Sequence, residues 1–149
     1  MDGPEVALAL DVLPQVVQLV RQAAAAAPDG LGPTQFRILR RLASGQWRCG
    51  QLATDLDVTP PTVSAAVDGL VRRRLVERQS PGPDRRAVPL AATEAGRRAL
   101  AAAERRQAEA LGAVLSGMPP AQRRALAVGL GGLAEALRRL PVAAEPARA

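Results

Sequence analysis

The stretch from Gln51 to Leu90 constrains the fold more than any other part of the chain. Residues 50–56 have helical spacing, with Leu52, Ala53 and Leu56 on one side. A second helix is expected after Thr59, because threonine is a good N-cap and the prolines that follow it suit the first helical positions. Its apolar residues form one stripe, made of Val63, Val67, Leu70 and Val71. The stretch therefore begins with two helices joined by a tight turn.

Two short strands are expected next, over residues 75–78 and 87–90. Residues 80–84 between them read Ser-Pro-Gly-Pro-Asp, which is typical of a turn. Helix, turn, helix and β-hairpin in this order form a winged helix-turn-helix, which places one helix in the major groove of DNA and a hairpin beside it. We therefore predict a mainly α protein with a small antiparallel β wing.

Further helices are expected on both sides of this module. One runs from Leu13 to Pro28, and residues 1–12 are ambiguous because Pro14 would either kink a longer helix or begin a new one. Other helices are expected over residues 33–43, 93–115 and 121–140. The segment Gln46-Trp47-Arg48 is too short to form more than a single-residue β-bridge. The last helix has leucines at alternating spacings of four and three, a heptad-type seam; they are Leu126, Leu130, Leu133, Leu137 and Leu140. The predicted division is a winged domain over 32–92, helical regions over 1–31 and 93–140, and a disordered tail over 141–149.

The charge is concentrated in one segment. The chain has a net charge of +6, and all its cations are arginine. Residues 72–106 contain ten arginines and four acids, whereas the rest of the chain is balanced. A concentrated positive charge is what a phosphate-binding surface needs, although a solvated charged face would have the same composition.

Several functional classes are disfavoured by composition. There is no histidine, one cysteine and no convergent pair of carboxylates, so we expect no enzymatic activity, no metal site and no cofactor. A disulfide within the chain is impossible. No apolar run is long enough for a signal peptide or a membrane span, which favours a soluble, cytoplasmic protein without a membrane partner.

The outward face of the second helix is the first candidate site. Thr62 and Ser64 can hydrogen-bond bases or phosphates, and Ala65 can touch a thymine methyl group. Asp68 and Arg72 are four residues apart and are predicted to pair. A plain amphipathic helix would also have a small polar outer face. The predicted DNA-binding residues of this region are Thr59, Pro61, Thr62, Ser64, Ala65, Arg72 and Arg73.

The hairpin is the second candidate site. Arg85 and Arg86 lie near its tip, where an arginine can enter the narrow minor groove of DNA. Asp84 can hold such an arginine by a charge-assisted pair. The alternative is two solvated arginines in a loop. Arg72, Arg73, Arg78, Arg97 and Arg98 are interpreted as phosphate contacts or as solubilising charges.

These residues resemble the multiple-antibiotic-resistance regulator (MarR) family of bacterial transcription factors over about residues 13–140. The most specific part is Asp84 and Arg86 followed by Leu90, Thr93 and Gly96. The resemblance implies a homodimer joined by the first and the last two helices, an operator near its own or a divergent gene, and often a small-molecule ligand that releases DNA. It places Pro61, Thr62, Ser64 and Ala65 in the major groove and Arg86, oriented by Asp84, in the minor groove.

Some positions depart from the family pattern. An arginine is common where this chain has Ala65. Glycine is common at Asp57 and Arg74; aspartate tolerates a left-handed turn conformation there, whereas arginine costs about 1 kcal/mol. A serine or threonine N-cap is usual at Cys49.

Regulation is left open by the sequence. Cys49 lies at a predicted helix start beside Arg48, which favours a redox role, although a small half-buried residue is the simpler interpretation. Peroxide sensors of the family carry their cysteine on the first helix instead. A ligand pocket would be walled by leucine, valine and alanine, with Trp47 or Phe36, and would favour apolar anions.

The combined prediction is a dimeric regulator, a repressor, that binds double-stranded DNA at a pseudo-palindromic operator and responds to a small effector. The alternative is a winged-helix module for protein–protein interaction that does not bind DNA.

Overall fold

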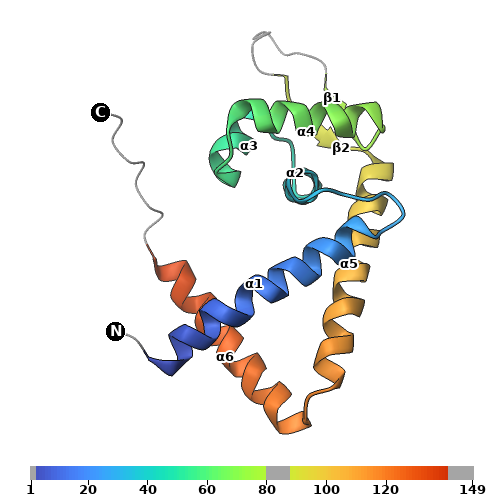
Figure 1. The fold of residues 1–149 in the computed structure, drawn as a ribbon. Coiled ribbons are helices and arrows are strands. Elements are labelled where there is room, and N and C mark those ends of the chain that lie inside the picture. Colours follow the sequence, from blue (N-terminus) through green and yellow to red (C-terminus); the bar gives the residue numbers. More distant parts are fainter. Residues whose placement is uncertain (1–2, 80–87, 141–149) are drawn as a thin grey trace. The chain divides into compact units, whose positions relative to one another are not determined.

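The computed structural model describes residues 3–79 and 88–140. It contains six helices and one antiparallel strand pair within those residues, which confirms the predicted fold class (Figure 1). The elements are α1 (Pro4–Ala25), α2 (Pro33–Ala43), α3 (Cys49–Leu56), α4 (Pro60–Arg72), β1 (Val76–Arg78), β2 (Leu90–Ala92), α5 (Glu94–Ser116) and α6 (Pro120–Arg139). The predicted hairpin tip at residues 80–87 and the predicted tail at 141–149 lie outside the described residues.

The chain divides into two compact units, residues 1–111 and residues 112–149. The first unit contains the hydrophobic core, which is built almost entirely from leucine, valine, isoleucine and alanine. The partly buried Phe36 and Trp47 pack against its edge. The largest fully buried side chains are Leu31, Ile38, Leu39, Leu52, Val63, Val67, Leu70, Val76 and Leu90.

The first helix resolves the ambiguity at the N-terminus. Residues 4–12 are helical, and α1 continues through Pro14 to Ala25. Ala24 is its only buried residue among those described. A hydrogen bond of 3.3 Å from the side-chain amide of Gln107 to the carbonyl oxygen of Val20 joins α5 to the last part of this helix.

Helices α3 and α4 both end in a left-handed residue. Asp57 (φ 51°) follows α3 and Arg74 (φ 57°) lies just beyond the end of α4. In each turn the next amide closes the helix end, because Val58 N–H donates to Ala53 and Leu75 N–H donates to Leu70. The expectation of left-handed turns at the two non-glycine positions is therefore confirmed.

The base of the wing is shifted relative to the sequence prediction. The second strand is β2 at Leu90–Ala92, with Val88 and Pro89 of the predicted strand outside it and residue 87 outside the described residues; β2 pairs Val76 with Ala92 and Arg78 with Leu90. Pro89 explains the difference. Its carbonyl oxygen accepts a hydrogen bond from Gln79 N–H at 2.8 Å, but proline has no N–H to complete the bridge.

Leu90 also joins the single-residue bridge that was expected near Trp47. The two residues exchange both backbone hydrogen bonds, at 2.8 and 3.2 Å, and the Leu90 side chain is fully buried. The short segment before α3 is thereby attached to the base of the wing.

The start of α5 is clamped to the turn after α4. The Thr93 hydroxyl donates to the carbonyl oxygen of Arg74 at 2.7 Å and accepts from Gly96 N–H at 3.0 Å. Thr93 N–H donates to the carbonyl oxygen of Leu75 at 3.1 Å. A β-carbon added at Gly96 would lie 2.0 Å from that Leu75 oxygen, so only glycine fits. The Leu90, Thr93 and Gly96 pattern thus fixes α4, the wing base and α5 together.

The second unit consists of the end of α5 and the whole of α6. A turn closed by Gly117 and Met118 N–H groups separates the two helices, as the Met118-Pro119-Pro120 break predicted. None of the 20 residues of α6 is buried. Large apolar side chains on it are exposed, including Val128, Leu130, Leu133 and Leu137.

Candidate nucleic-acid interface

Helix α4 has one buried face and one exposed face. Val63, Val67 and Leu70 have no exposed surface, and the burial of each contributes roughly 1.5–3 kcal/mol to folding. This stripe fixes the rotation of the helix about its axis. The opposite face is left to solvent, and it carries the predicted contact residues Pro61, Thr62, Ser64 and Ala65, all exposed.

The first turn of α4 has an unexpected hydroxyl pair. Thr59 occupies the N-cap position as predicted, but its side chain makes no capping hydrogen bond. Its hydroxyl lies 2.7 Å from the hydroxyl of Thr62 instead. One proton lies between the two oxygens and the other is free to donate outward. The pair therefore presents a donor and acceptors on the exposed side of the helix.

Asp68 does not pair with Arg72 as its spacing predicts. Its carboxylate accepts a hydrogen bond of 2.7 Å from the guanidinium group of Arg78 in β1. The ion pair ties the middle of α4 to the base of the wing. Both side chains are close to half exposed, so the pair contributes at most about 1 kcal/mol to stability. Nothing in the local spacing of the sequence identifies a partner ten residues away.

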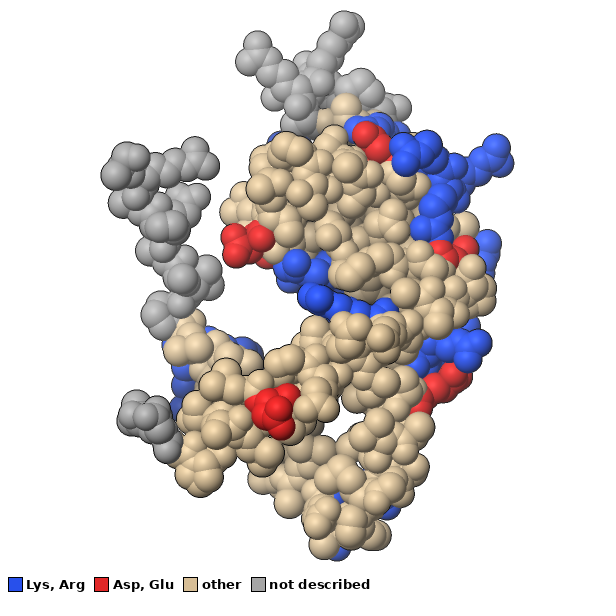
Figure 2. Space-filling view, in the orientation of Figure 1, with Lys and Arg blue, Asp and Glu red and all other residues tan. Residues whose placement is uncertain are grey.

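Arginines extend beyond the end of α4. Arg72, Arg73 and Arg74 are exposed, and Figure 2 shows basic side chains gathered on this side of the molecule. Arg73 also reaches back to the side chain of Gln35 in α2, at 3.4 Å. The predicted wing contacts Asp84, Arg85 and Arg86 lie outside the described residues.

Side chains of helix α2 contact both α3 and α4. The Arg37 guanidinium donates to the carbonyl oxygen of Leu56 at the end of α3, at 2.5 Å, and Arg41 pairs with Asp55 at 2.6 Å. Gly69 lies so close to Gln35 that an added β-carbon would come within 2.9 Å of its amide nitrogen. The two arginine contacts join α2 to α3 and the Gly69 contact joins α2 to α4; sequence patterns revealed none of them.

Cys49 is the first residue of α3, and Arg48 occupies the N-cap position. The backbone N–H of Arg48 donates a hydrogen bond of 2.9 Å to the side-chain oxygen of Gln51. A side chain from the first turn of α3 therefore pairs with the N–H of the N-cap residue. Cys49 is partly buried and packs against the core. A redox role for it stays a prediction.

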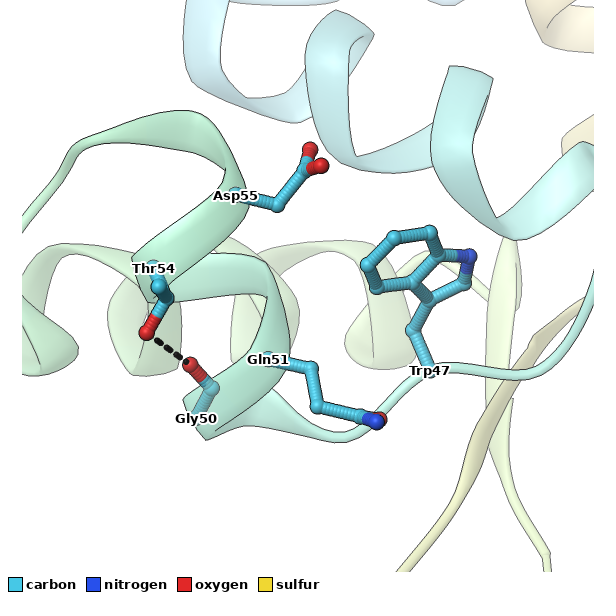
Figure 3. Close-up of a pocket in the computed structure, with 5 residues that line it drawn as sticks. All are labelled: Trp47, Gly50, Gln51, Thr54 and Asp55. Carbon is cyan, nitrogen blue, oxygen red and sulfur yellow. Dashed lines mark hydrogen bonds between the residues drawn. The ribbon is translucent and has the colours of Figure 1, made fainter. Parts of the chain in front are cut away.

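A shallow hollow opens beside α3 (Figure 3). It is lined by Trp47, Gly50, Gln51, Thr54 and Asp55. It includes the predicted Trp47, but Gln51, Thr54 and Asp55 are polar, and no lining residue is a cation that could hold an anion. It is therefore a different cavity from the leucine-, valine- and alanine-walled pocket expected for an effector.

Among residues 3–79 and 88–140, no helix is long and apolar enough to cross a membrane. No group of three or more His, Cys, Asp and Glu side chains in the same residues could hold a metal ion.

The buried stripe of α4, its exposed outer face and the strand pair beside it define a winged helix-turn-helix DNA-binding protein. The model of the MarR family matches residues 29–87, which span α2, α3, α4 and β1. Over these residues the chain is similar to the MarR family, and this match together with the solved structures supports a DNA-binding transcriptional regulator. Regulators of this family are in general transcription factors rather than enzymes. No curated protein matches the chain.

Several solved structures have a similar fold over about nine tenths of this chain. A MarR family protein of Mycobacterium tuberculosis is 26% identical, with a TM-score of 0.73, over 90% of this chain and 96% of its own. A MarR family transcriptional regulator of Rhodococcus sp. RHA1 is also 26% identical, with a TM-score of 0.68 and the same coverage. A MepR mutant of S. aureus, solved bound to an oligodeoxyribonucleotide, is 19% identical with a TM-score of 0.66, over 91% of this chain and 99% of its own, and shares the fold.

Proposed function

We propose that the protein is a homodimeric repressor that reads a pseudo-palindromic operator and is released by a small apolar or anionic effector. Residues 1–31 and 93–140 would form the dimerisation region. The outer face of α4 would enter the major groove, with Thr59, Pro61, Thr62, Ser64 and Ala65 facing the bases, and Arg72 and Arg73 would contact phosphates.

The observation that carries the proposal is the exposed apolar surface of the terminal helices. All the exposed large apolar side chains among the described residues lie on α1, near the end of α5, on α6 or just after it. On α6 they include Leu130, Leu133 and Leu137 of the predicted heptad-type seam. Apolar surface of this extent marks a protein–protein interface in a soluble protein. A second copy of the chain would cover it and would bring two α4 helices into one molecule.

The dimer can be tested by sedimentation. Leu133→Glu places a charge on the seam and is expected to convert dimers to monomers. Val128→Glu is a matched control, because Val128 lies on the same helix, outside the seam, and is 77% exposed. Dimers that survive Leu133→Glu unchanged, or a wild-type protein that sediments as a monomer, would contradict the proposed interface.

The wing is tested by the salt dependence of DNA binding. If Arg86 contacts the DNA backbone or minor groove, Arg86→Ala should weaken binding and reduce the slope of log affinity against log salt by about 0.9. Arg124→Ala in α6 removes the same charge and should leave the slope unchanged. Equal slopes for wild type and Arg86→Ala would remove Arg86 from the interface.

The operator is sought first in the DNA upstream of the protein's own gene. We expect a salt-sensitive complex in a mobility-shift assay that survives excess non-specific DNA, with half-sites about one helical turn apart. Loss of the complex to competitor would place the operator elsewhere. Absence of any complex at low salt would favour the protein–protein module instead.

Effector release is tested by a panel of apolar carboxylic acids, scored for displacement of DNA and for a change in melting temperature. Displacement by at least one compound is expected. A panel without effect on either quantity would count against an apolar anion as the effector.

A further inference from the structure

The exposed face of α4 from residue 60 to residue 67 carries only short side chains, which limits how it can recognise bases. From Pro60 to Val67 its exposed side chains are those of Pro60, Pro61, Thr62, Ser64 and Ala65. Arginine and lysine read guanine, asparagine and glutamine read adenine, and carboxylates read cytosine. None of these side chains is present on this face. What remains is methyl and methylene groups together with hydroxyls.

The nearest charged side chains do not fill the gap. The Asp68 carboxylate, which could otherwise accept a hydrogen bond from a cytosine amino group, is held by Arg78 at 2.7 Å. Arg73 extends toward Gln35 in α2. Arg72 lies 11 residues after Pro61, about 16 Å further along the helix axis. Long polar side chains are therefore absent from the part of α4 that would enter the groove first.

The spacing of the apolar side chains on this face is comparable to the spacing of successive bases in DNA. Pro61 and Ala65 are four residues apart on one side of the helix, which places their β-carbons about 5–6 Å from each other. Successive bases on one DNA strand are about 3.4 Å apart along the axis, so the two side chains cover one to two base steps. Thr62 follows Pro61 in the chain and adds a methyl group, and its hydroxyl shares a hydrogen bond with that of Thr59 at 2.7 Å.

We infer that α4 reads the 5-methyl groups of thymines in the major groove, through Pro61, Ala65 and the Thr62 methyl group. The thymine methyl is the one apolar feature of the major-groove edge, and alanine, threonine and similar groups are its natural contacts. Short side chains also let the helix backbone approach the base edges closely. The inference rests on the proposed function, in which this face of α4 enters the major groove.

Replacement of thymine by uracil provides the test, because uracil pairs in the same way and lacks only the methyl group. Duplexes that bind the full-length protein are first selected from a random library, and each thymine is then replaced by uracil in turn. We expect about fourfold weaker binding for each contacted methyl group that is removed, at a few positions per half-site. The minor-groove edge of the base pair is unchanged, so contacts of the wing are not affected.

A double-mutant cycle assigns the contact to a side chain. Ala65→Gly should bind the thymine duplex more weakly and should no longer distinguish thymine from uracil at one position. Ala43→Gly is the control, since it makes the same change at an exposed helical position in α2, outside the proposed dimerisation region, and should retain the wild-type preference. Any effect of uracil on the DNA itself cancels in this comparison.

The outcomes separate the two levels of the argument. Tight binding with equal affinity for thymine and uracil at every position would overturn thymine reading and leave the regulator function intact. A thymine preference retained in Ala65→Gly, Pro61→Ala and Thr62→Ser would also overturn it. Failure to select any duplex would overturn the proposed function together with the inference.

Discussion

The hydroxyl group of Thr93 lies 2.7 Å from the carbonyl oxygen of Arg74 and donates a hydrogen bond to it. The hydroxyl oxygen of Thr93 in turn accepts a hydrogen bond from Gly96 N–H at 3.0 Å. One side chain therefore begins α5 and holds the left-handed turn that follows α4. Because β1 begins two residues after Arg74, Thr93 also fixes where the wing begins relative to α4.

Thr93→Val keeps the shape of the side chain but removes both hydrogen bonds. We expect a loss of about 1–2 kcal/mol in the free energy of unfolding, the usual cost of a lost cap. Thr93→Ser should retain most of the stability. Thr54→Val is the control, because the Thr54 hydroxyl makes an exposed hydrogen bond to the carbonyl oxygen of Gly50 within its own helix. Denaturant titration measures all three, and similar losses for both valine variants would show that the clamp contributes nothing special.

Gly96→Ala should be among the more damaging single-methyl changes in the chain. The new β-carbon would lie 2.0 Å from the Leu75 oxygen and 3.2 Å from a methyl carbon of Leu39. Relief of this overlap requires α5 to move away from the turn, at a cost of about 1–3 kcal/mol or more.

Gly112→Ala is the opposite case in the same helix. Nothing lies within 4 Å of its added β-carbon, so the alanine should gain about 0.5–1 kcal/mol from helix propensity. Melting temperatures that move in the same direction for the two variants would contradict the close packing of Gly96.

Arg74→Gly should raise the stability by up to about 1 kcal/mol, since arginine at a φ of 57° carries the strain of a left-handed conformation. The backbone hydrogen bonds of this turn do not depend on the side chain. Asp57→Gly should gain less, because aspartate tolerates the same conformation. Thermal unfolding of both variants checks the order, and a destabilised Arg74→Gly would show that the arginine side chain has a structural role.

The Asp68–Arg78 ion pair is expected to affect DNA binding more than folding. Arg78→Ala should change the free energy of unfolding by less than about 1 kcal/mol, because the pair is exposed. DNA affinity should fall further, since the wing base is no longer tied to α4.

The exchange Asp68→Arg with Arg78→Asp separates position from charge. It keeps the net charge and restores a pair across the same two positions. Recovery of affinity in the double variant, relative to each single variant, would support a positioning role. Equal loss in the double variant and in Arg78→Ala would instead mean that the guanidinium contacts DNA at its own position.

Local sequence rules predicted the parts of the fold that depend on local causes. Val63, Val67 and Leu70 follow helical spacing, and the structure buries all three. The left-handed turns at Asp57 and Arg74 were expected because the family pattern favours glycine there. In each case the cause lies within a few residues of the effect.

Contacts between distant segments were not predictable in the same way. The partner of Asp68 depends on where β1 lies, and the register of β2 depends on the missing N–H of Pro89 together with the bridge to Trp47. Thr93 was recognised only as part of a family pattern. Its role needs the fold, because Arg74 is 19 residues away in the sequence.

Because α6 has no buried residue, the stability of this helix should depend on the concentration of the protein. A helix of 20 residues with no buried side chain is only marginally stable in water on its own. Under the proposed pairing its stability comes from a second molecule and obeys mass action. Dilution should then reduce helical content and open the C-terminal region to proteases before the winged domain unfolds. In a cell, proteases would degrade monomers and spare dimers. The concentration of dimer would therefore rise more steeply than the rate at which the chain is synthesised.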